Sequence, residues 1–263
     1  MMTDTWRFID TGPCSAAYNM ALDEAIATAV RKDSSPPTLR LYGWNSPSVS
    51  IGYFQKISDI NTDYCSKNNI PVVRRYTGGR AILHNHELTY SFSIKTTHGL
   101  FSKGLRDCYK EISRAFNNAL LKVGLLPETR LRRRSHHSRS SLCFHATSYG
   151  EITINNKKVI GSAQKRWQDG LLQQGSIPYS VDNDDTLKVF RVEDAYVKQN
   201  LIIGLKDIFP DFNPDTFKKI LKTSFEETFS IWLIPSAPSS EEISLARDIE
   251  TQKYLTNKWN YRR

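Results

Sequence analysis

The chain has 263 residues, of which 39% are hydrophobic and 24% charged, and its formal net charge is +9. This composition is ordinary for a folded globular protein and too apolar for a disordered one. The N-terminal residues include acids and lack the apolar segment of a signal peptide, and no apolar run has the length of a membrane span. We therefore expect a cytoplasmic protein that does not associate with membranes.

Hydrophobic alternation and turn residues predict the first elements of the chain. Strands are expected over 6–10, 38–42, 48–53, 71–76 and 87–95. Helices are expected from the residue after Ser15 to about residue 30, and over 62–69. Gly12-Pro13 is expected to end the first strand, because proline cannot donate a ladder hydrogen bond.

The second half begins with an amphipathic helix over 105–123 that ends at Gly124. A hairpin is expected over 151–166, turning at Asn155-Asn156, and residues 170–181 are expected to add a strand to the same sheet. Asn213-Pro214 predicts the start of a further helix, and Ser239 or Ser240 caps a last one that runs to about Tyr254. This order indicates an α+β layer structure with a helical C-terminal elaboration.

More than half of the excess positive charge lies in residues 130–139, which hold Arg130, Arg132, Arg133, Arg134 and Arg139. Three interpretations stay open for this run. It is a solvated loop, a nucleic-acid contact, or a docking surface for an acidic protein. No helix-turn-helix, zinc-finger or RNA-binding signature accompanies it.

Two segments carry residues of the types found in binding and catalytic sites. In residues 74–91, Gly78-Gly79 follows an expected strand and is flanked by arginines, a pattern typical either of a plain turn or of an anion or carbonyl site. It lacks the spacing of a P-loop. In residues 140–152, Cys143 follows the arginine run, and positive surroundings stabilise a nucleophilic thiolate. The other cysteines, Cys14, Cys65 and Cys108, are expected to be packing residues, and the cysteines and histidines have no metal-binding spacing.

Residues 157–163 place two lysines before a run of small residues. Because side chains of a strand alternate between its faces, only one of Lys157 and Lys158 is expected to point into the protein. On this pattern alone, a solvated lysine pair in the hairpin is the favoured interpretation.

Taken together, these segments resemble the biotin/lipoate protein ligase superfamily, and most closely its LipM-type octanoyl-[acyl-carrier-protein]:protein octanoyltransferases. The resemblance rests on NMALDEAI (19–26), RRYTGGRAILHNHELTYS (74–91), SSLCFHAT (140–147), KKVIGSAQ (157–164), QQGSIP (173–178) and KYLTNKWNYRR (253–263). It implies a mixed sheet flanked by helices, as in class II aminoacyl-tRNA synthetases and biotin synthetases. It also implies one catalytic domain over 1–263, with a core at about 33–235 and the helical elaboration at 236–263.

The resemblance assigns roles to individual residues. It implies that Cys143 is the acyl-thioester nucleophile and that Lys158 lowers the pKa of this thiol and orients the acyl carbonyl. It implies an acyl pocket whose binding residues are Arg75, Thr77, Gly78, Gly79, Arg80, His84, Gly161, Ser162 and Ala163. The implied donor is octanoyl-acyl carrier protein. The implied acceptor is a lysine of a lipoyl domain, such as the glycine-cleavage H protein or a 2-oxoacid dehydrogenase subunit.

Lipoate ligases, which use ATP, are the nearest alternative. They read Gly-Gly-Gly where this chain has Gly78-Gly79-Arg80, and they do not need a cysteine at position 143. An arginine would fill the space of an adenylate phosphate, so we expect no ATP, no other cofactor and no metal. We also expect a monomer that does not bind nucleic acid. A relative that binds octanoate or lipoate without turnover is the non-enzymatic alternative, and an amidotransferase fits the segment at 74–80 less well.

Overall fold

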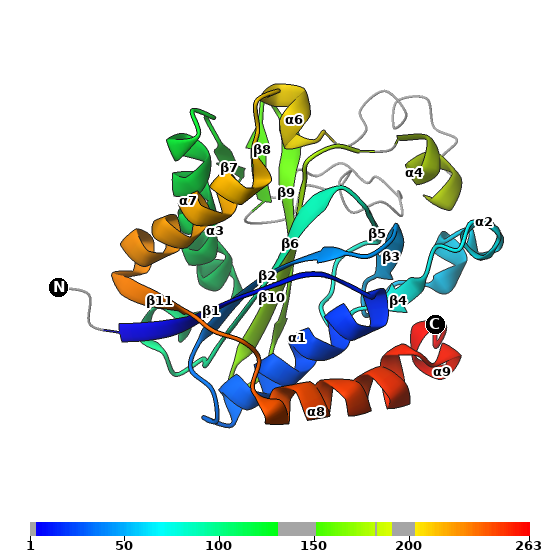
Figure 1. The fold of residues 1–263 in the computed structure, drawn as a ribbon, viewed down its shortest axis with the longest axis horizontal. Helices are drawn as coiled ribbons and strands as arrows, with labels where there is room; N and C mark the ends of the chain where they lie inside the picture. The colour runs from blue at the N-terminus through cyan, green and yellow to red at the C-terminus, as the bar shows by residue number, and fades with distance from the viewer. Residues whose placement is uncertain (1–3, 131–150, 182, 191–202) are drawn as a thin grey trace.

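The computed structural model describes residues 4–130, 151–181, 183–190 and 203–263. Within them, eight strands form a mixed sheet in the order β11-β1-β2-β6-β10-β9-β8-β7 (Figure 1). These strands are β1 (Asp4–Cys14), β2 (Thr38–Trp44), β6 (Glu87–Ile94), β7 (Glu128–Arg130), β8 (Glu151–Ile154), β9 (Lys157–Arg166), β10 (Leu171–Pro178) and β11 (Ile231–Pro235). β1 is parallel to both of its neighbours, and in the run β6, β10, β9 and β8 each strand is antiparallel to the next.

A smaller sheet of the described residues has the order β4-β3-β5. It consists of β3 (Ser48–Ile51), β4 (Val72–Arg74) and β5 (Ile82–His84). Helices α2 (Thr62–Lys67) and α4 (Asn183–Phe190) contribute side chains to the apolar cluster around this sheet. The Gly78-Gly79 turn lies between β4 and β5, so this sheet carries one of the segments of chemical interest.

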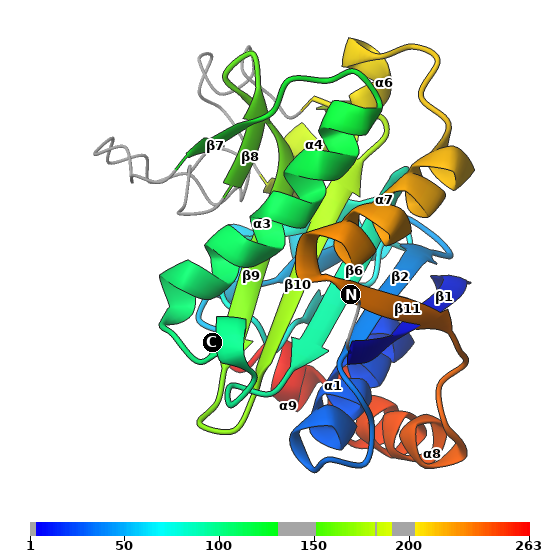
Figure 2. The ribbon, with the colours of Figure 1, turned by 90° about the vertical axis from the view of Figure 1, so that its left-hand side faces the viewer.

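Helices cover both faces of the large sheet (Figure 2). α3 (Leu105–Lys122) and α7 (Pro214–Phe229) pack on one face, and α1 (Ala16–Arg31) and α8 (Ser240–Ile249) pack on the other. α6 (Leu205–Ile208), a π-helical turn (Glu250–Tyr254), α9 (Asn257–Asn260) and short 3-10 turns at Ile57–Asp59 and Gly99–Phe101 complete the described elements. The mixed sheet flanked by helices confirms the predicted fold class. No helix in the described ranges has the length and apolar character needed to cross a bilayer.

The predicted helix caps are confirmed. The Ser15 side chain accepts a hydrogen bond from the backbone N–H of Tyr18 and begins α1. Asn213 caps α7 with Pro214 in its first turn, and Ser239 begins α8. These short polar side chains satisfy backbone donors that have no partner inside the helix.

The side chains of β6 pack on both faces of the large sheet. All eight of its residues are buried. Leu88, Tyr90, Phe92 and Ile94 belong to the apolar cluster beneath α3 and α7. Thr89 and Ser91 point to the opposite face, where they hydrogen-bond to carboxylates. The predicted alternation is therefore confirmed, and its polar half faces a buried network rather than water.

One prediction about a strand is wrong, and a strand after α7 was not predicted from the sequence. β1 does not end at Gly12-Pro13 but continues to Cys14, because a register shift between Asp10 and Pro13, with Gly12 at φ +62°, absorbs the irregularity as a bulge. The segment after α7 was not expected to be a strand. There, Ser230 takes a left-handed conformation that ends the helix, and Ile231–Pro235 turns back to pair in parallel with β1. A bulge and a long-range pairing of this kind leave little local signal.

Candidate active site

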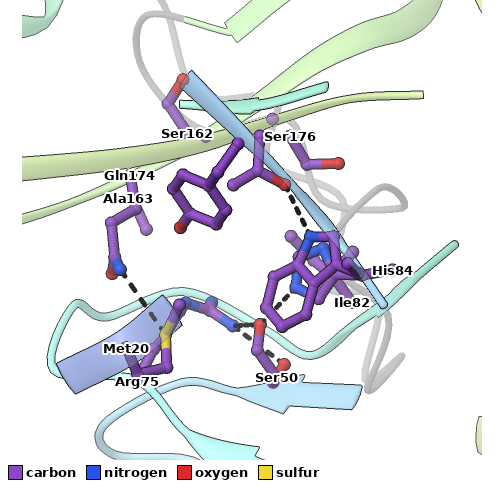
Figure 3. Close-up of a pocket in the computed structure, with 14 residues that line it drawn as sticks. Met20, Ser50, Arg75, Ile82, His84, Ser162, Ala163, Gln174 and Ser176 are labelled. Carbon is purple, nitrogen blue, oxygen red and sulfur yellow. Dashed lines mark hydrogen bonds between the residues drawn. The ribbon is translucent and has the colours of Figure 1, made fainter. Parts of the chain in front are cut away.

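A pocket lies between the two sheets, on the face of the large sheet that also packs against α1 (Figure 3). It encloses about 350 Å³, including the part open to solvent. Its lining residues are Met20, Tyr42, Trp44, Ser50, Arg75, Ile82, His84, Thr89, Gly161, Ser162, Ala163, Gln174, Gly175 and Ser176. They come from α1, β2, β3, β5, β6, β9, β10 and the segment after β4, so the fold brings distant motifs to one place.

Arg75 holds the glycine-rich turn against β3. One terminal nitrogen donates to the Ser50 carbonyl and hydroxyl, at 3.0 Å each. The other donates to the carbonyl oxygens of Gly78 and Arg80, at 2.7 Å each. The side chain is buried, so these bonds are shielded from water. Arg75 thus lines the pocket while its donors order the protein backbone around it.

Glycine is needed where this turn meets its neighbours. Gly79 has φ +83°, a conformation that other residues rarely adopt, and a Cβ there would lie 3.4 Å from the Cβ of Ala163. A Cβ on Gly52 would lie only 1.9 Å from the Gly79 carbonyl oxygen. The end of β3 and the turn are therefore in direct backbone contact at one rim of the pocket, and the turn lies close to the Ala163 side chain of β9.

His84 is fixed by a buried chain of hydrogen bonds. Its Nε2 lies 2.7 Å from the Ser50 Oγ, and its Nδ1 lies 2.8 Å from a carboxylate oxygen of Glu87. The second Glu87 oxygen accepts a bond of 2.7 Å from the Ser176 hydroxyl. The indole of Trp44 stacks on the imidazole with a centroid distance of 4.0 Å. These polar groups satisfy one another, so the wall that they form offers mainly carbon atoms to a ligand.

A second buried network begins at Asp23 in α1. This carboxylate forms an ion pair of 2.7 Å with Arg40, and both side chains are fully buried. It also accepts hydrogen bonds from Tyr42 at 2.8 Å and from the Gln174 amide at 2.7 Å. Burial, followed by the charge of Asp23, raises the pKa of Tyr42 well above its usual value, which keeps the phenol a donor. The Gln174 carbonyl in turn accepts from Thr77 at 2.8 Å, which connects the network to the glycine-rich turn.

The structure brings most of the predicted site residues together. Those that line the pocket are Arg75, His84, Gly161, Ser162 and Ala163. Those that form the adjoining turn are Thr77, Gly78, Gly79 and Arg80. Of these, Thr77, Gly78 and Arg80 bond to residues of the pocket wall. Cys143 and most of the basic run at 130–139 lie outside the described residues.

Lys158 is buried, with 5% of its surface exposed, whereas Lys157 is exposed. β9 carries one extra residue here, since Ile160 pairs with Ile152 but Lys158 pairs with Thr153. This shift puts Lys158 on the face opposite the apolar cluster that holds Ile152 and Ile160. That is the face of the sheet on which the pocket lies. The prediction that only one of the two lysines points inward is confirmed.

Several lining residues were not predicted from the sequence. Met20, Tyr42, Trp44, Gln174 and Ser176 enter the pocket through tertiary packing. Met20, Gln174 and Ser176 lie in motifs that carry the resemblance, at 19–26 and 173–178, but no role was predicted for them. The polar half of β6 was a further signal, and its Thr89 hydroxyl accepts a bond of 2.7 Å from the Trp44 indole. Ser50 gave no signal, because a serine in a short strand has no distinctive neighbours.

The cysteines of the described residues differ from what a nucleophile requires. Burial raises the pKa of Cys65 to about 11. Burial also raises the pKa of Cys108, although Arg166 lies close enough to oppose this effect. Both thiols are therefore protonated at neutral pH, which agrees with the prediction that they are packing residues. Cys14 is half-buried and unpaired. In the described ranges, no three His, Cys, Asp or Glu side chains group so as to hold a metal ion.

Residues 15–226 match the family described as the lipoyl protein ligase A/B catalytic domain, and the chain belongs to this family. The chain is similar to the octanoyltransferase LipM of Bacillus subtilis, with 36% identity and full coverage of both chains. It is also 36% identical to the octanoyltransferase LipM of Halalkalibacterium halodurans, over 99% of this chain and 100% of the relative.

Solved structures agree with this assignment. A lipoate-protein ligase A bound with ATP superposes with a TM-score of 0.83 at 26% identity, covering 98% of each chain. A bipartite lipoate protein ligase from Thermoplasma acidophilum, studied with its E2 lipoyl domain, gives a TM-score of 0.79 at 25% identity, covering 98% of this chain and 97% of the other. The fold is thus shared by transferases and ligases, and the site must distinguish them.

Proposed function

We propose that this protein is an octanoyltransferase that takes an octanoyl group from a carrier-protein thioester onto Cys143 and passes it to a lysine of a lipoyl domain. Octanoyl transfer is the activity for which the full-length relatives are named. The observation that carries the proposal is the pocket itself. Motif residues from four separate segments meet around a space whose polar side chains bond to one another and leave an apolar wall.

The chemistry balances without a nucleotide. The Cys143 thiolate attacks the carbonyl carbon of the donor thioester, and the carbon–sulfur bond to the carrier breaks, releasing the carrier thiolate. The neutral amine of the acceptor lysine then attacks the new thioester, forms an amide after losing a proton, and releases the Cys143 thiolate. The first exchange replaces one thioester by another, and the second makes an amide from a thioester, so both steps proceed without ATP.

The apolar wall suits an unbranched acyl chain. The seven carbons beyond the carbonyl would gain about 5 kcal/mol on full burial, at about 0.8 kcal/mol per methylene. A chain carrying a hydroxyl at its far end would leave that group without a partner against this wall, a cost of about 1–3 kcal/mol. The pocket therefore fits an octanoyl group better than a hydroxylated chain of the same length.

The glycine-rich turn favours a transferase over an ATP-dependent ligase. Gly79 is in the left-handed region, but Arg80 is not among the residues with positive φ. Backbone conformation therefore does not require glycine at position 80. A third glycine, as in the ligases, would serve to leave space, and in this chain the Arg80 side chain occupies that position.

Mass spectrometry tests the proposal. Incubated with octanoyl-acyl carrier protein and no nucleotide, the protein should gain one octanoyl group on Cys143. The adduct should be cleaved by hydroxylamine, because a thioester reacts under conditions that leave an amide intact. Addition of a lipoyl domain, from an H protein or from a 2-oxoacid dehydrogenase subunit, should discharge it. Full activity of Cys143→Ala with octanoate and ATP would instead identify a ligase. Retained octanoate binding with no turnover in the wild type would identify a non-catalytic relative.

Lys158 is the best candidate to activate the thiol. An ammonium beside Cys143 stabilises the thiolate and, near the carbonyl, the oxyanion. Lys158→Ala should slow acyl-enzyme formation by about 10²-fold and raise the apparent pKa of Cys143 by about 1 to 3. The pKa is read from iodoacetamide alkylation against pH. Lys157→Ala is the matched control and should change little, since Lys157 is exposed. Equal effects in the two variants would contradict the assignment.

The basic run at 130–139 is our candidate for donor docking, because acyl carrier proteins are acidic. Replacing Arg132, Arg133 and Arg134 by serine should slow association with the donor, and the defect should shrink as salt rises. An unchanged association rate at low salt would support the interpretation of this run as a solvated loop.

A further inference from the structure

A surface rich in aromatic and cationic side chains lies beside the pocket. Its rings are Tyr53, Phe54, Tyr76, Trp167 and Trp259, and neighbouring ring centroids are 4.8–6.0 Å apart. The surface joins the segment after β3, the residue before the glycine-rich turn, the end of β9 and the C-terminal α9. We call it the aromatic–cationic surface.

Five cations lie over these rings, and one of them, the Arg31 guanidinium, is 4.4 Å from the ring centroid of Trp167. The Arg262 guanidinium is 3.9 Å from the ring centroid of Tyr53 and 4.0 Å from that of Trp259. The Lys165 ammonium is 5.5–5.7 Å from three rings, and Arg263 is 5.4 Å from Phe54. The fifth cation, Lys253, is 4.0 Å from the centroid of Trp259.

The charge of this surface is only partly compensated. Lys253 pairs with Glu24 at 2.7 Å, and Arg31 pairs with Asp169 at 2.8 Å. Within the described ranges, no carboxylate pairs with Lys165, Arg262 or Arg263. Burial, with the charges of Arg262 and Arg263, lowers the pKa of the underlying Arg74 to about 10, which agrees with a local positive potential. Phe54, which lies beside Arg263, is 67% exposed.

The surface adjoins the rim of the pocket. The backbone N–H of Tyr53 donates to the Thr77 carbonyl at 3.0 Å, which ties the surface to the glycine-rich turn. Along β9, Lys165 follows Ala163 by two residues and therefore points to the same face of the strand, about 7 Å further on. A partner seated on this surface would thus stand directly next to the pocket.

We propose that the aromatic–cationic surface docks the lipoyl-domain acceptor through a carboxylate-bearing face beside its target lysine. The inference rests on the proposed function and adds where the acceptor binds. Phe54 is exposed and the other four rings are half-buried. Aromatic rings with arginine are the composition of interface centres, and cations without a carboxylate partner in the described ranges favour an acidic partner. The surface is preformed by its ring contacts, so docking would order few side chains.

The acceptor and the donor differ in how far the reactive group extends from the body of the domain that carries it. The acceptor amine stands on a four-carbon stem, so the body of the acceptor domain must contact the protein at the rim of the pocket. The donor carries its acyl group on a much longer pantetheine arm and can dock further away. Cations around the incoming lysine also disfavour its ammonium form, and only the neutral amine attacks the thioester.

The test uses charge reversal on the full chain. The double variant Lys165→Glu/Arg263→Glu should weaken binding of the unacylated lipoyl domain by about tenfold or more, measured by calorimetry at low salt. Phe54→Ala should weaken binding as well, without a change in its salt dependence. The matched control is the double variant Lys110→Glu/Lys219→Glu, which makes the same charge change at exposed positions of α3 and α7, on the opposite face of the sheet. Unfolding midpoints check that each variant folds.

Two further measurements separate this inference from the proposed function. Acyl-enzyme formation from octanoyl-acyl carrier protein, and its discharge by hydroxylamine, should be unchanged in the double variant, while discharge onto the lipoyl domain slows at subsaturating acceptor. Lipoyl-domain binding equal to that of the wild type would overturn the inference, and the proposed function would stand. Weaker acylation by the donor, with acceptor binding intact, would also overturn it. If the wild type forms no acyl-enzyme, the proposed function fails, and the binding measurement still decides the docking.

Discussion

The contact between Gly52 and the glycine-rich turn offers a direct test of how the pocket rim is built. A Cβ at position 52 would lie 1.9 Å from the Gly79 carbonyl oxygen and 2.9 Å from its carbon. Ordinary contacts of a Cβ begin near 3.4 Å, so in Gly52→Ala the two backbones must separate by about 1.5 Å. The obstacle is backbone on both sides, which cannot rotate away as a side chain could.

The separation would be resisted by the bonds that hold the turn. Arg75 bonds to the carbonyl oxygens on either side of Gly79, at 2.7 Å each. Overpacking of this kind costs about 1–3 kcal/mol. Replacing glycine by alanine also restricts the unfolded chain, which stabilises the folded state by about 0.4–1 kcal/mol. We therefore expect Gly52→Ala to lower the free energy of unfolding by about 1–2 kcal/mol.

Urea denaturation followed by fluorescence measures this difference, and Gly78→Ala is its matched control. Gly78 lies in the same turn, yet its added Cβ would meet no atom within 4 Å and its φ is not in the left-handed region. Gly78→Ala should therefore leave the free energy of unfolding unchanged or raise it slightly. If Gly52→Ala and Gly78→Ala unfold at the same urea concentration, the contact at the rim is not as tight as described.

Two further predictions concern buried charges away from the rim. Burial opposes ionisation of Glu242, but its bonds to Arg7, of 2.6 and 2.9 Å, outweigh this and lower its pKa below 4.5. The ion pair therefore stabilises the protein fully above pH 4.5, and this stabilisation is lost as the pH falls through the pKa of Glu242 in the folded protein. Glu242→Gln should make the free energy of unfolding depend less on pH in the acid range. Asp211→Asn, at an exposed position, should not change this dependence. Asp23→Asn should lower the free energy of unfolding by about 3–5 kcal/mol, because it leaves the Arg40 guanidinium buried without its carboxylate. Urea denaturation measures this loss, and an unchanged midpoint of the urea transition would refute the prediction.

The helices could be predicted from the sequence because their signals are local. Ser15, Asn213-Pro214 and Ser239 each mark a helix start with a side chain that bonds to a backbone donor three residues on. The hairpin was equally predictable, since Asn155 and Asn156 tolerate the φ of +49° and +63° that its two-residue turn requires. These features depend on neighbours in sequence and not on the rest of the fold.

The strand irregularities could not be predicted in the same way. The extra residue in β9 decides that Lys158 rather than Lys157 lies on the pocket side, yet it is visible only in the pairing with β8. The bulge in β1 and the pairing of β11 with β1 likewise depend on partners more than 25 residues away. A shift of one residue exchanges the two faces of a strand, so sequence alone left the lysine assignment to the resemblance.

In the candidate site, the type of a residue predicts its role less well than its position in the fold does. Arg75 and His84 are chemically suited to hold an anion or move a proton, and the motif alone favours such roles. In the structure, Arg75 bonds to backbone carbonyls and His84 lies between Ser50 and Glu87. Their polar atoms support the wall, and the wall presents carbon to the ligand. A motif dense in polar residues can therefore build an apolar pocket, provided that each polar group finds its partner within the protein.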